Sequence, residues 1–255
     1  MNSVASETNK DLSKLVANMR ASFKNLVKSK TPPDRAGALN EMLKQANKLD
    51  TLGKKSSHRE ICIVTRPLVA LLAELQQKPH GLKASVLRAL AGTLDYYWDV
   101  VMNGGFEEDF GKKKDARILV VDDEPLSLRA TVFALQNGQF QVTGIESPEK
   151  ALSVIDSEPW GLFLFDINMP DISGYDLCRS VRTSTRSSQV PVIFVTGDQT
   201  SEVQNACAEC GGNDIVSKPF SFPELNLKCW TWNFWSLRRQ SSGLPISHGI
   251  HQDNS

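Results

Sequence analysis

The sequence has no long apolar stretch: none of its runs approaches the roughly 18 consecutive apolar residues that suggest a membrane span. It does not begin with a basic segment followed by an apolar one, which is the pattern of a secretory signal. Its 5 cysteines are odd in number and irregularly spaced, which argues against a secreted disulfide framework. These absences predict a soluble, cytoplasmic protein that does not enter a membrane.

The motifs of a catalytic output domain are also missing. We find no Gly-rich nucleotide-binding loop and no kinase or cyclase motif. Cys207 and Cys210 form a C-x-x-C pair, but a structural zinc site needs about four ligands and no second close pair of Cys or His accompanies it. We therefore expect these two cysteines to be ordinary small helix residues.

The charge is distributed unevenly along the chain although the formal net charge is zero. Residues 1–114 contain 19 Lys and Arg against 12 Asp and Glu, which gives +7, whereas residues 115–255 contain 10 against 17, which gives −7. Such asymmetry favours two separately folded parts.

The first part has the apolar spacing of helices throughout residues 10–103. Thr31-Pro32 is a helix start signal, Pro67 is expected to kink or split a helix, and Pro79 is expected to open the last one. Four amphipathic segments predict a separate all-α domain over residues 1–103, either an up-and-down bundle or hairpins that complete a bundle by dimerising. A charge-rich linker over 104–116 and a disordered tail over 239–255 complete this division.

The second part alternates apolar strands with helices, and a polar residue follows each of four strands. Near-continuous apolar strands such as 162–165 and 192–195 are typical of a parallel sheet covered on both faces. If the strands are parallel, the polar residues collect at the carboxyl edge of the sheet, where open α/β sheets bind ligands. These residues are Asp122, Asp123, Asp166, Thr196 and Lys218. Their side chains suit a divalent cation and a phosphoryl group.

Four motifs in this order resemble the receiver domain of two-component response regulators, the CheY-like family. They are Val120-Val121-Asp122-Asp123-Glu124-Pro125, Asp166-Ile167-Asn168-Met169-Pro170-Asp171-Ile172-Ser173-Gly174, Pro191-Val192-Ile193-Phe194-Val195-Thr196-Gly197 and Lys218-Pro219-Phe220. The resemblance covers residues 117–238, about half of the chain. It implies an α/β doubly wound sheet of five parallel strands, of the flavodoxin/CheY-like type, in the order 2-1-3-4-5.

The resemblance also implies a site and a function. Asp166 would accept a phosphoryl group from a histidine kinase or a histidine phosphotransfer protein, while Thr196 and Lys218 contact that group. The expected cofactor is Mg²⁺, held by Asp122 through water, by Asp123 and Asp166 directly, and by the backbone carbonyl of Asn168. The protein would then be a response regulator of a two-component phosphorelay that switches protein–protein interactions, not an enzyme with turnover.

Two positions depart from the family's pattern. Many receivers have an aromatic residue three positions before the lysine, where this chain has Ile215, and this puts the family's aromatic switch in doubt. Gly197 stands where a small Ala is usual. A competing hypothesis for the whole protein is a pseudo-receiver that serves as a binding scaffold without phosphorylation.

Three hypotheses remain for the first part. It is an interaction or dimerisation module, a histidine phosphotransfer domain, or a nucleic-acid-binding unit. His80-Gly81-Leu82-Lys83-Ala84-Ser85 resembles the phosphotransfer motif, but Gly is missing at Ala84 and Pro79 places His80 at a helix start. The basic residues are spread over all the helices, as on a solvated face, so nucleic acid is not the expected partner.

The final helix has two apolar faces. At 100° per residue, one face has Leu225, Cys229 and Trp232, and nearly opposite lie Leu227, Trp230, Phe234 and Leu237. A helix on one side of a sheet needs only one apolar face. The second face predicts an interface, with a homodimer as the expected assembly, and packing within the chain is the alternative.

Overall fold

The computed structural model describes residues 2–55, 59–103, 117–198 and 200–242. The chain divides into two compact units, residues 1–113 with 226–231, and residues 114–225 with 232–255. The last helix therefore contributes residues to both units. The expected linker over 104–116 lies outside the described residues, and so does the expected tail from residue 243 onward.

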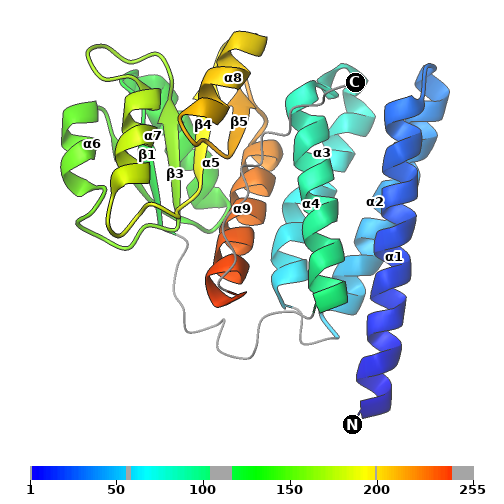
Figure 1. Ribbon diagram of the computed structural model, residues 1–255. Helices are drawn as coiled ribbons and strands as arrows, with labels where there is room; N and C mark the ends of the chain where they lie inside the picture. The colour runs from blue at the N-terminus through cyan, green and yellow to red at the C-terminus, as the bar shows by residue number, and fades with distance from the viewer. Residues whose placement is uncertain (1, 56–58, 104–116, 199, 243–255) are drawn as a thin grey trace. The chain divides into compact units, whose positions relative to one another are not determined.

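The first unit is a bundle of four α-helices and one short 3₁₀ turn (Figure 1). Helix α1 contacts α2 and α4, α2 also contacts α3, and α3 contacts α4. The bundle therefore closes within one chain and does not need a second copy to complete it. Its elements are α1 (Asn2–Lys28), α2 (Pro32–Gly53), α3 (Arg59–Gln77), η1 (Pro79–Gly81) and α4 (Ala84–Asn103).

Three of the four prolines of this unit act in different ways. Pro32 occupies the first turn of α2, where Thr31 accepts a hydrogen bond from the backbone N–H of Asp34 at 3.3 Å, as expected for an N-cap. Pro67 lies inside α3 without splitting it. Packing of the buried face of α3 outweighs the hydrogen bond that the proline removes. Pro79 opens only the 3₁₀ turn η1, so the last helix begins later than expected, at Ala84.

The second unit has five parallel strands in the order β2-β1-β3-β4-β5, and helices alternate with the strands along the chain (Figure 1). This confirms the expected doubly wound fold and its strand order. The strands are β1 (Arg117–Val121), β2 (Gln141–Ile145), β3 (Leu162–Asp166), β4 (Val192–Thr196) and β5 (Asp214–Ser217). The helices are α5 (Pro125–Asn137), α6 (Pro148–Val154), α7 (Gly174–Thr183), α8 (Ser201–Glu209) and α9 (Phe222–Ser242).

Burial explains why the central strands read as continuous apolar runs. Every residue of β3, β4 and β5 is buried, whereas the edge strand β2 is partly exposed. Phe163 and Phe165 of β3 pack with ring centroids 5.5 Å apart in the core cluster, which also includes Phe194 of β4. Aromatic side chains bury large apolar areas, so this cluster fixes the register of the central strands. The carboxyl ends of four strands thereby align.

Candidate functional site

The predicted polar residues lie together at the carboxyl edge of the sheet. Asp166 is the last residue of β3 and pairs in register with Val195, one residue before Thr196 at the end of β4. Thr196 pairs with Ser217, the residue before Lys218. Asp122 directly follows β1. Strand register therefore places all four polar positions within about one residue of the same edge.

Lys218 joins the two buried aspartates. Its Nζ lies 2.6 Å from Asp166 Oδ1 and 2.9 Å from Asp122 Oδ2. Asp122 is 3% exposed and Asp166 is 8% exposed. Two carboxylates in so little water repel each other, and the ammonium group neutralises part of that repulsion.

Burial and charge act in opposite directions on these groups. Desolvation raises the pKa of Asp166, as does the charge of Asp122, whereas the hydrogen bond and charge of Lys218 lower it, and the balance is a raised pKa. Desolvation lowers the pKa of Lys218, but its hydrogen bonds with Asp166 and Asp122 outweigh that effect, so the pKa is raised. The protonation states of the site are therefore coupled.

Further hydrogen bonds fix the orientation of both carboxylates. Asp122 Oδ1 accepts from the backbone N–H of Glu124 at 3.0 Å, and Ser127 Oγ donates to Asp122 Oδ2 at 2.5 Å. The N–H of Asn168 donates to Asp166 Oδ2 at 2.7 Å. Ser127 was not among the expected site residues, and the only sequence signal was its place in the first turn of a helix that follows the acidic cluster.

Thr196 is positioned by the loop that follows β4. Its side chain is 1% exposed, and its Oγ1 accepts a hydrogen bond from the N–H of Asp198 at 3.1 Å. This contact uses a lone pair of the oxygen and leaves the hydroxyl proton for another acceptor. The Thr196 hydroxyl can therefore donate a hydrogen bond to an anionic group at the sheet edge.

Gly174 lets the start of α7 approach the backbone of Asp166. A Cβ at this position would lie 2.1 Å from Asp166 O and 3.2 Å from the Cα of Ile167. Ser173 caps the same helix through a capping box with Asp176. The glycine at the end of the second motif thus has a steric reason, because no side chain fits there.

The oxygen atoms at this edge fit a magnesium ion in chemistry, but the acidic side chains are not assembled around one point. Carboxylate and carbonyl oxygens are the ligands that Mg²⁺ takes in proteins. Asp123 is exposed. Within the described ranges, no three or more His, Cys, Asp or Glu side chains come close enough to hold a metal ion. The charge beside Asp122 and Asp166 is the ammonium of Lys218. The expected ligand set therefore stays a prediction.

The two positions that depart from the family's pattern differ in their surroundings. Ile215 is 3% exposed and belongs to the core cluster of the sheet together with Phe194. Tyr175 packs on Phe194 with ring centroids 5.5 Å apart, so an aromatic pair is present in this region, but not on β5. Gly197 has open space where a Cβ would stand, with nothing within 4 Å, so an alanine would fit there.

The second apolar face of α9 is not an open patch. Leu227 and Phe234 are fully buried within the chain, and Trp230 and Leu237 are partly buried. Leu227 and Phe234 therefore have no exposed surface with which to form the expected homodimer interface. A side chain that is buried in the monomer cannot reach a partner, because its surface is already covered.

The remaining candidate residues, a histidine and two cysteines, lie outside the cluster at the carboxyl edge of the sheet. His80 lies in the 3₁₀ turn η1 and not within an α-helix. Cys207 and Cys210 are both buried and free, and the Cys210 thiol donates to Cys207 O at 3.2 Å. Cys207 lies in α8, whereas Cys210 is the residue that caps its end. Among the helices in the described ranges, none is both long and apolar enough to span a bilayer.

Known proteins are similar in sequence to the part of the chain that contains this site. The response regulator receiver domain family matches residues 118–229. The two-component response regulator ORR5 of Oryza sativa subsp. japonica is 31% identical over 113 residues, which are 44% of this chain and 84% of that protein. A probable cyclic di-GMP phosphodiesterase of Vibrio cholerae is 31% identical over 131 residues, 51% of this chain but only 30% of that protein.

Among solved structures, the receiver domain of a sensor histidine kinase from Pseudomonas aeruginosa PAO1 shares 25% sequence identity with a TM-score of 0.45. The match covers 47% of this chain and 98% of that one, which was solved with a magnesium ion coordinated in its active-site cleft. The chain belongs to the response regulator receiver family. It is thus a signalling protein of the two-component type, with an additional helical region before the receiver.

Proposed function

We propose that Asp166 accepts a phosphoryl group from a phosphohistidine of a histidine kinase or a histidine phosphotransfer protein. The observation that supports this most is the position of Lys218, whose Nζ lies 2.6 Å from Asp166 Oδ1 at the carboxyl edge of the sheet. An ammonium at this place pairs with the carboxylate before transfer, and it pairs equally well with a phosphoryl oxygen afterwards.

The reaction is a nucleophilic displacement at phosphorus. A carboxylate oxygen of Asp166 forms the new P–O bond while the P–N bond to the donor's imidazole breaks. The electron pair of that bond returns to the imidazole nitrogen, and the ring, still protonated on its other nitrogen, leaves as neutral imidazole. Asp166 needs no general base because its carboxylate reacts in the ionised form. Lys218 and Thr196 then hold the phosphoryl oxygens.

Magnesium would be held directly by the carboxylates of Asp123 and Asp166 and by the backbone carbonyl of Asn168, and through water by Asp122. Bound there, it supplies positive charge that neutralises the phosphoryl oxygens. Asp122 is already oriented for such a role by Glu124 N–H and Ser127. Asp123 is exposed and unrestricted by the core, so it is free to turn towards the site.

The phosphodonor must dock where its phosphohistidine reaches Asp166. Among the exposed large apolar side chains of the unit that holds the site, three lie on α5 and at the start of α9: Leu126 is 73%, Phe133 59% and Phe222 41% exposed. Leu126 follows Asp122 by four residues, and Phe133 packs on Phe222 with ring centroids 6.1 Å apart. We propose that this apolar surface of α5 and the start of α9 receives the donor.

The output is a change in protein–protein interactions and not catalytic turnover. The phosphodiesterase relative is matched over 30% of its own length, and the sequence of this chain has no catalytic output motif. The helical bundle would pass the signal to a protein partner. We do not propose nucleic acid as that partner, since the basic residues of the bundle are spread over all of its helices. A cytoplasmic location remains the expectation and suits a donor phosphorylated by ATP.

A phosphorylation assay tests the assignment against the pseudo-receiver hypothesis. The full chain is incubated with magnesium and acetyl phosphate, and its intact mass is measured. We expect one added phosphoryl group, none in the Asp166→Asn variant, and an unchanged gain in Asp171→Asn, which removes an exposed carboxylate from the same loop. Labelling of Asp166→Asn at the wild-type rate, or no labelling of the wild type, contradicts the proposal.

A further inference from the structure

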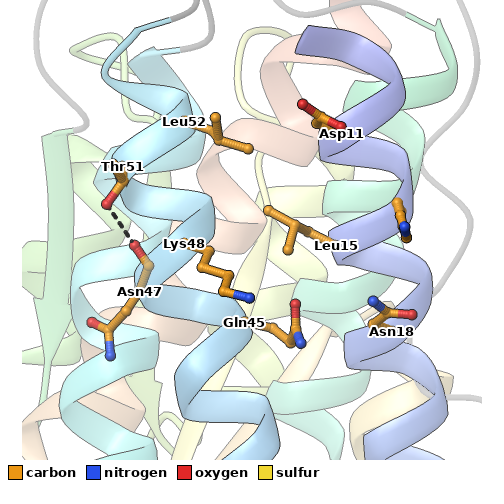
Figure 2. Close-up of a pocket in the computed structure, with 9 residues that line it drawn as sticks. Asp11, Leu15, Asn18, Gln45, Asn47, Lys48, Thr51 and Leu52 are labelled. Atoms are coloured by element: carbon orange, nitrogen blue, oxygen red, sulfur yellow. Dashed lines mark hydrogen bonds between the residues drawn. The ribbon is translucent and has the colours of Figure 1, made fainter. Parts of the chain in front are cut away.

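A cavity lined by both polar and apolar side chains lies along the seam between α1 and α2 in the helical bundle (Figure 2). Its volume is about 580 Å³, enough for a small organic molecule. Leu15 of α1 and Gln45 of α2 are buried and form its floor. Lys14, Asn18 and Lys48 are exposed at its mouth. The cavity therefore combines a closed floor with a charged entrance.

The floor has a hydrogen-bond acceptor that the protein does not use. Gln45 is 5% exposed, and its Nε2 donates to Glu41 Oε1. That bond fixes which end of the amide faces Glu41. The other end, Gln45 Oε1, is buried without a hydrogen-bond partner in the described part of the chain. Buried polar atoms are almost always paired, so an orphaned acceptor that lines a cavity indicates a ligand with an N–H or O–H group.

The mouth of the cavity has an excess of positive charge. Lys44 on α2 is paired with Glu41, and Lys54, directly after α2, is paired with Asp50. Lys14 and Lys48 have no ion-pair partner among the residues that the structure describes. Asp11 is the one acidic side chain in the lining, so the charge at the mouth is positive by one. Two unpaired ammonium groups at one opening favour an anion.

We propose that this cavity binds a small organic anion whose phosphate or carboxylate group lies next to a hydroxyl. The anionic group pairs with Lys14 and Lys48, and the hydroxyl donates to Gln45 Oε1. Asn18 lies beside Gln45 and supplies a further amide (Figure 2). The site is independent of Asp166, so it adds a second chemical input to the protein and does not rest on the phosphotransfer reaction.

Calorimetric titration of the full chain tests the site with three probes: glycerol 3-phosphate, glycerate and inorganic phosphate. Glycerol 3-phosphate has a hydroxyl on the carbon next to the one that bears its phosphate, and glycerate has a hydroxyl on the carbon next to its carboxylate. Inorganic phosphate has no carbon-bound hydroxyl. We expect glycerol 3-phosphate or glycerate to bind more tightly than inorganic phosphate. The tighter of the two identifies the anion. Failure of both to bind the wild type at millimolar concentration overturns the proposal.

Three variants assign the contacts. Replacing both lysines, Lys14→Gln with Lys48→Gln, should weaken binding by about tenfold or more, since each loses a charge-assisted hydrogen bond. The matched control Lys24→Gln removes an exposed lysine of α1 outside the cavity and should change affinity less than about twofold. Gln45→Met should abolish the preference for the hydroxyl-bearing probe, with folding checked by circular dichroism. Equal losses in Lys24→Gln and the double variant, or an intact preference in Gln45→Met, contradict the site.

Discussion

The Nζ of Lys218 lies 2.6 Å from Oδ1 of Asp166, so the proposed nucleophile of this receiver is held by the cation that, in the proposed reaction, also contacts the transferred group. The pair is not isolated, because the same Nζ lies 2.9 Å from Asp122 Oδ2. Loss of this ammonium would therefore leave both carboxylates without the cation that they share.

Removal of the ammonium should raise the pKa of Asp166 further. Desolvation and the charge of Asp122 already raise this pKa, whereas the hydrogen bond and charge of Lys218, and to a smaller extent the hydrogen bond from the backbone N–H of Asn168, lower it. Lys218→Met keeps a long side chain and removes the charge. Titration of the Asp166 carboxyl carbon by NMR should therefore show a pKa above the wild-type value. The control Lys150→Met, an exposed lysine of α6, should leave it unchanged. A lower pKa in Lys218→Met is incompatible with the ion pair.

Thr196 should separate the chemistry from the response. Its hydroxyl lies at the sheet edge but is not the nucleophile, and its oxygen accepts from Asp198 N–H at 3.1 Å. Thr196→Ala should still gain a phosphoryl group with magnesium and acetyl phosphate. Hydrogen exchange should then show the loop after β4 unchanged by phosphorylation, because the hydroxyl that links the loop to the phosphoryl group is missing. Identical exchange changes in Thr196→Ala and the wild type would refute the assignment of the switch.

Gly174 should be intolerant of even a methyl group. A Cβ there would lie 2.1 Å from Asp166 O, so either α7 or the end of β3 has to move. Overpacking of this kind typically costs about 1–3 kcal/mol. Gly174→Ala should lower the free energy of unfolding by that amount in urea titrations and also slow the labelling of Asp166. Gly197→Ala is the matched control, since nothing lies within 4 Å of its Cβ, and its stability should stay within about 0.5 kcal/mol. Equal stability of both variants would contradict the steric role of Gly174.

The sequence predicted the sheet and the place of the site because both follow from local patterns. Apolar strands that end in Asp166, Thr196 and the residue before Lys218 align by register alone, and no side-chain geometry is needed to predict that edge. The contacts of Ser127 and the steric role of Gly174 depend on how a loop folds back, which spacing does not specify. For the same reason the exposed position of Asp123 was not predicted.

In the helical bundle, packing decided what local signals left open. Pro67 is a helix breaker by its chemistry, yet α3 runs from Arg59 to Gln77, because Val64 and Leu68 on either side of it are fully buried. Pro79 did start a helical turn, but a 3₁₀ one. The sequence also allowed hairpins that complete a bundle by dimerising, because the pattern of an amphipathic helix does not show which helix packs against its apolar face. Contacts of α1 with α4 close the bundle within one chain.

Burial on the final helix bears on whether its second apolar face forms a dimer interface or packs within the chain. Leu227 and Phe234 of α9 are fully buried, whereas Trp230 and Leu237 are partly buried, so two of the four residues of the stripe that suggested self-association already pack inside the chain. Phe234→Ala should lower the free energy of unfolding by about 3–5 kcal/mol, the usual loss for a buried aromatic side chain replaced by alanine. It should not change the molar mass in light scattering.

Phe133→Ala is the matched control for this measurement. It removes the same side chain from α5, where Phe133 is 59% exposed, and should cost much less stability. A dimer held by the stripe makes the opposite prediction: Phe234→Ala would halve the molar mass, with or without phosphorylation, and its unfolding would match that of the control. Removal of a fully buried ring leaves a cavity in the core. We therefore expect Phe234→Ala to lower the free energy of unfolding and to leave the molar mass unchanged.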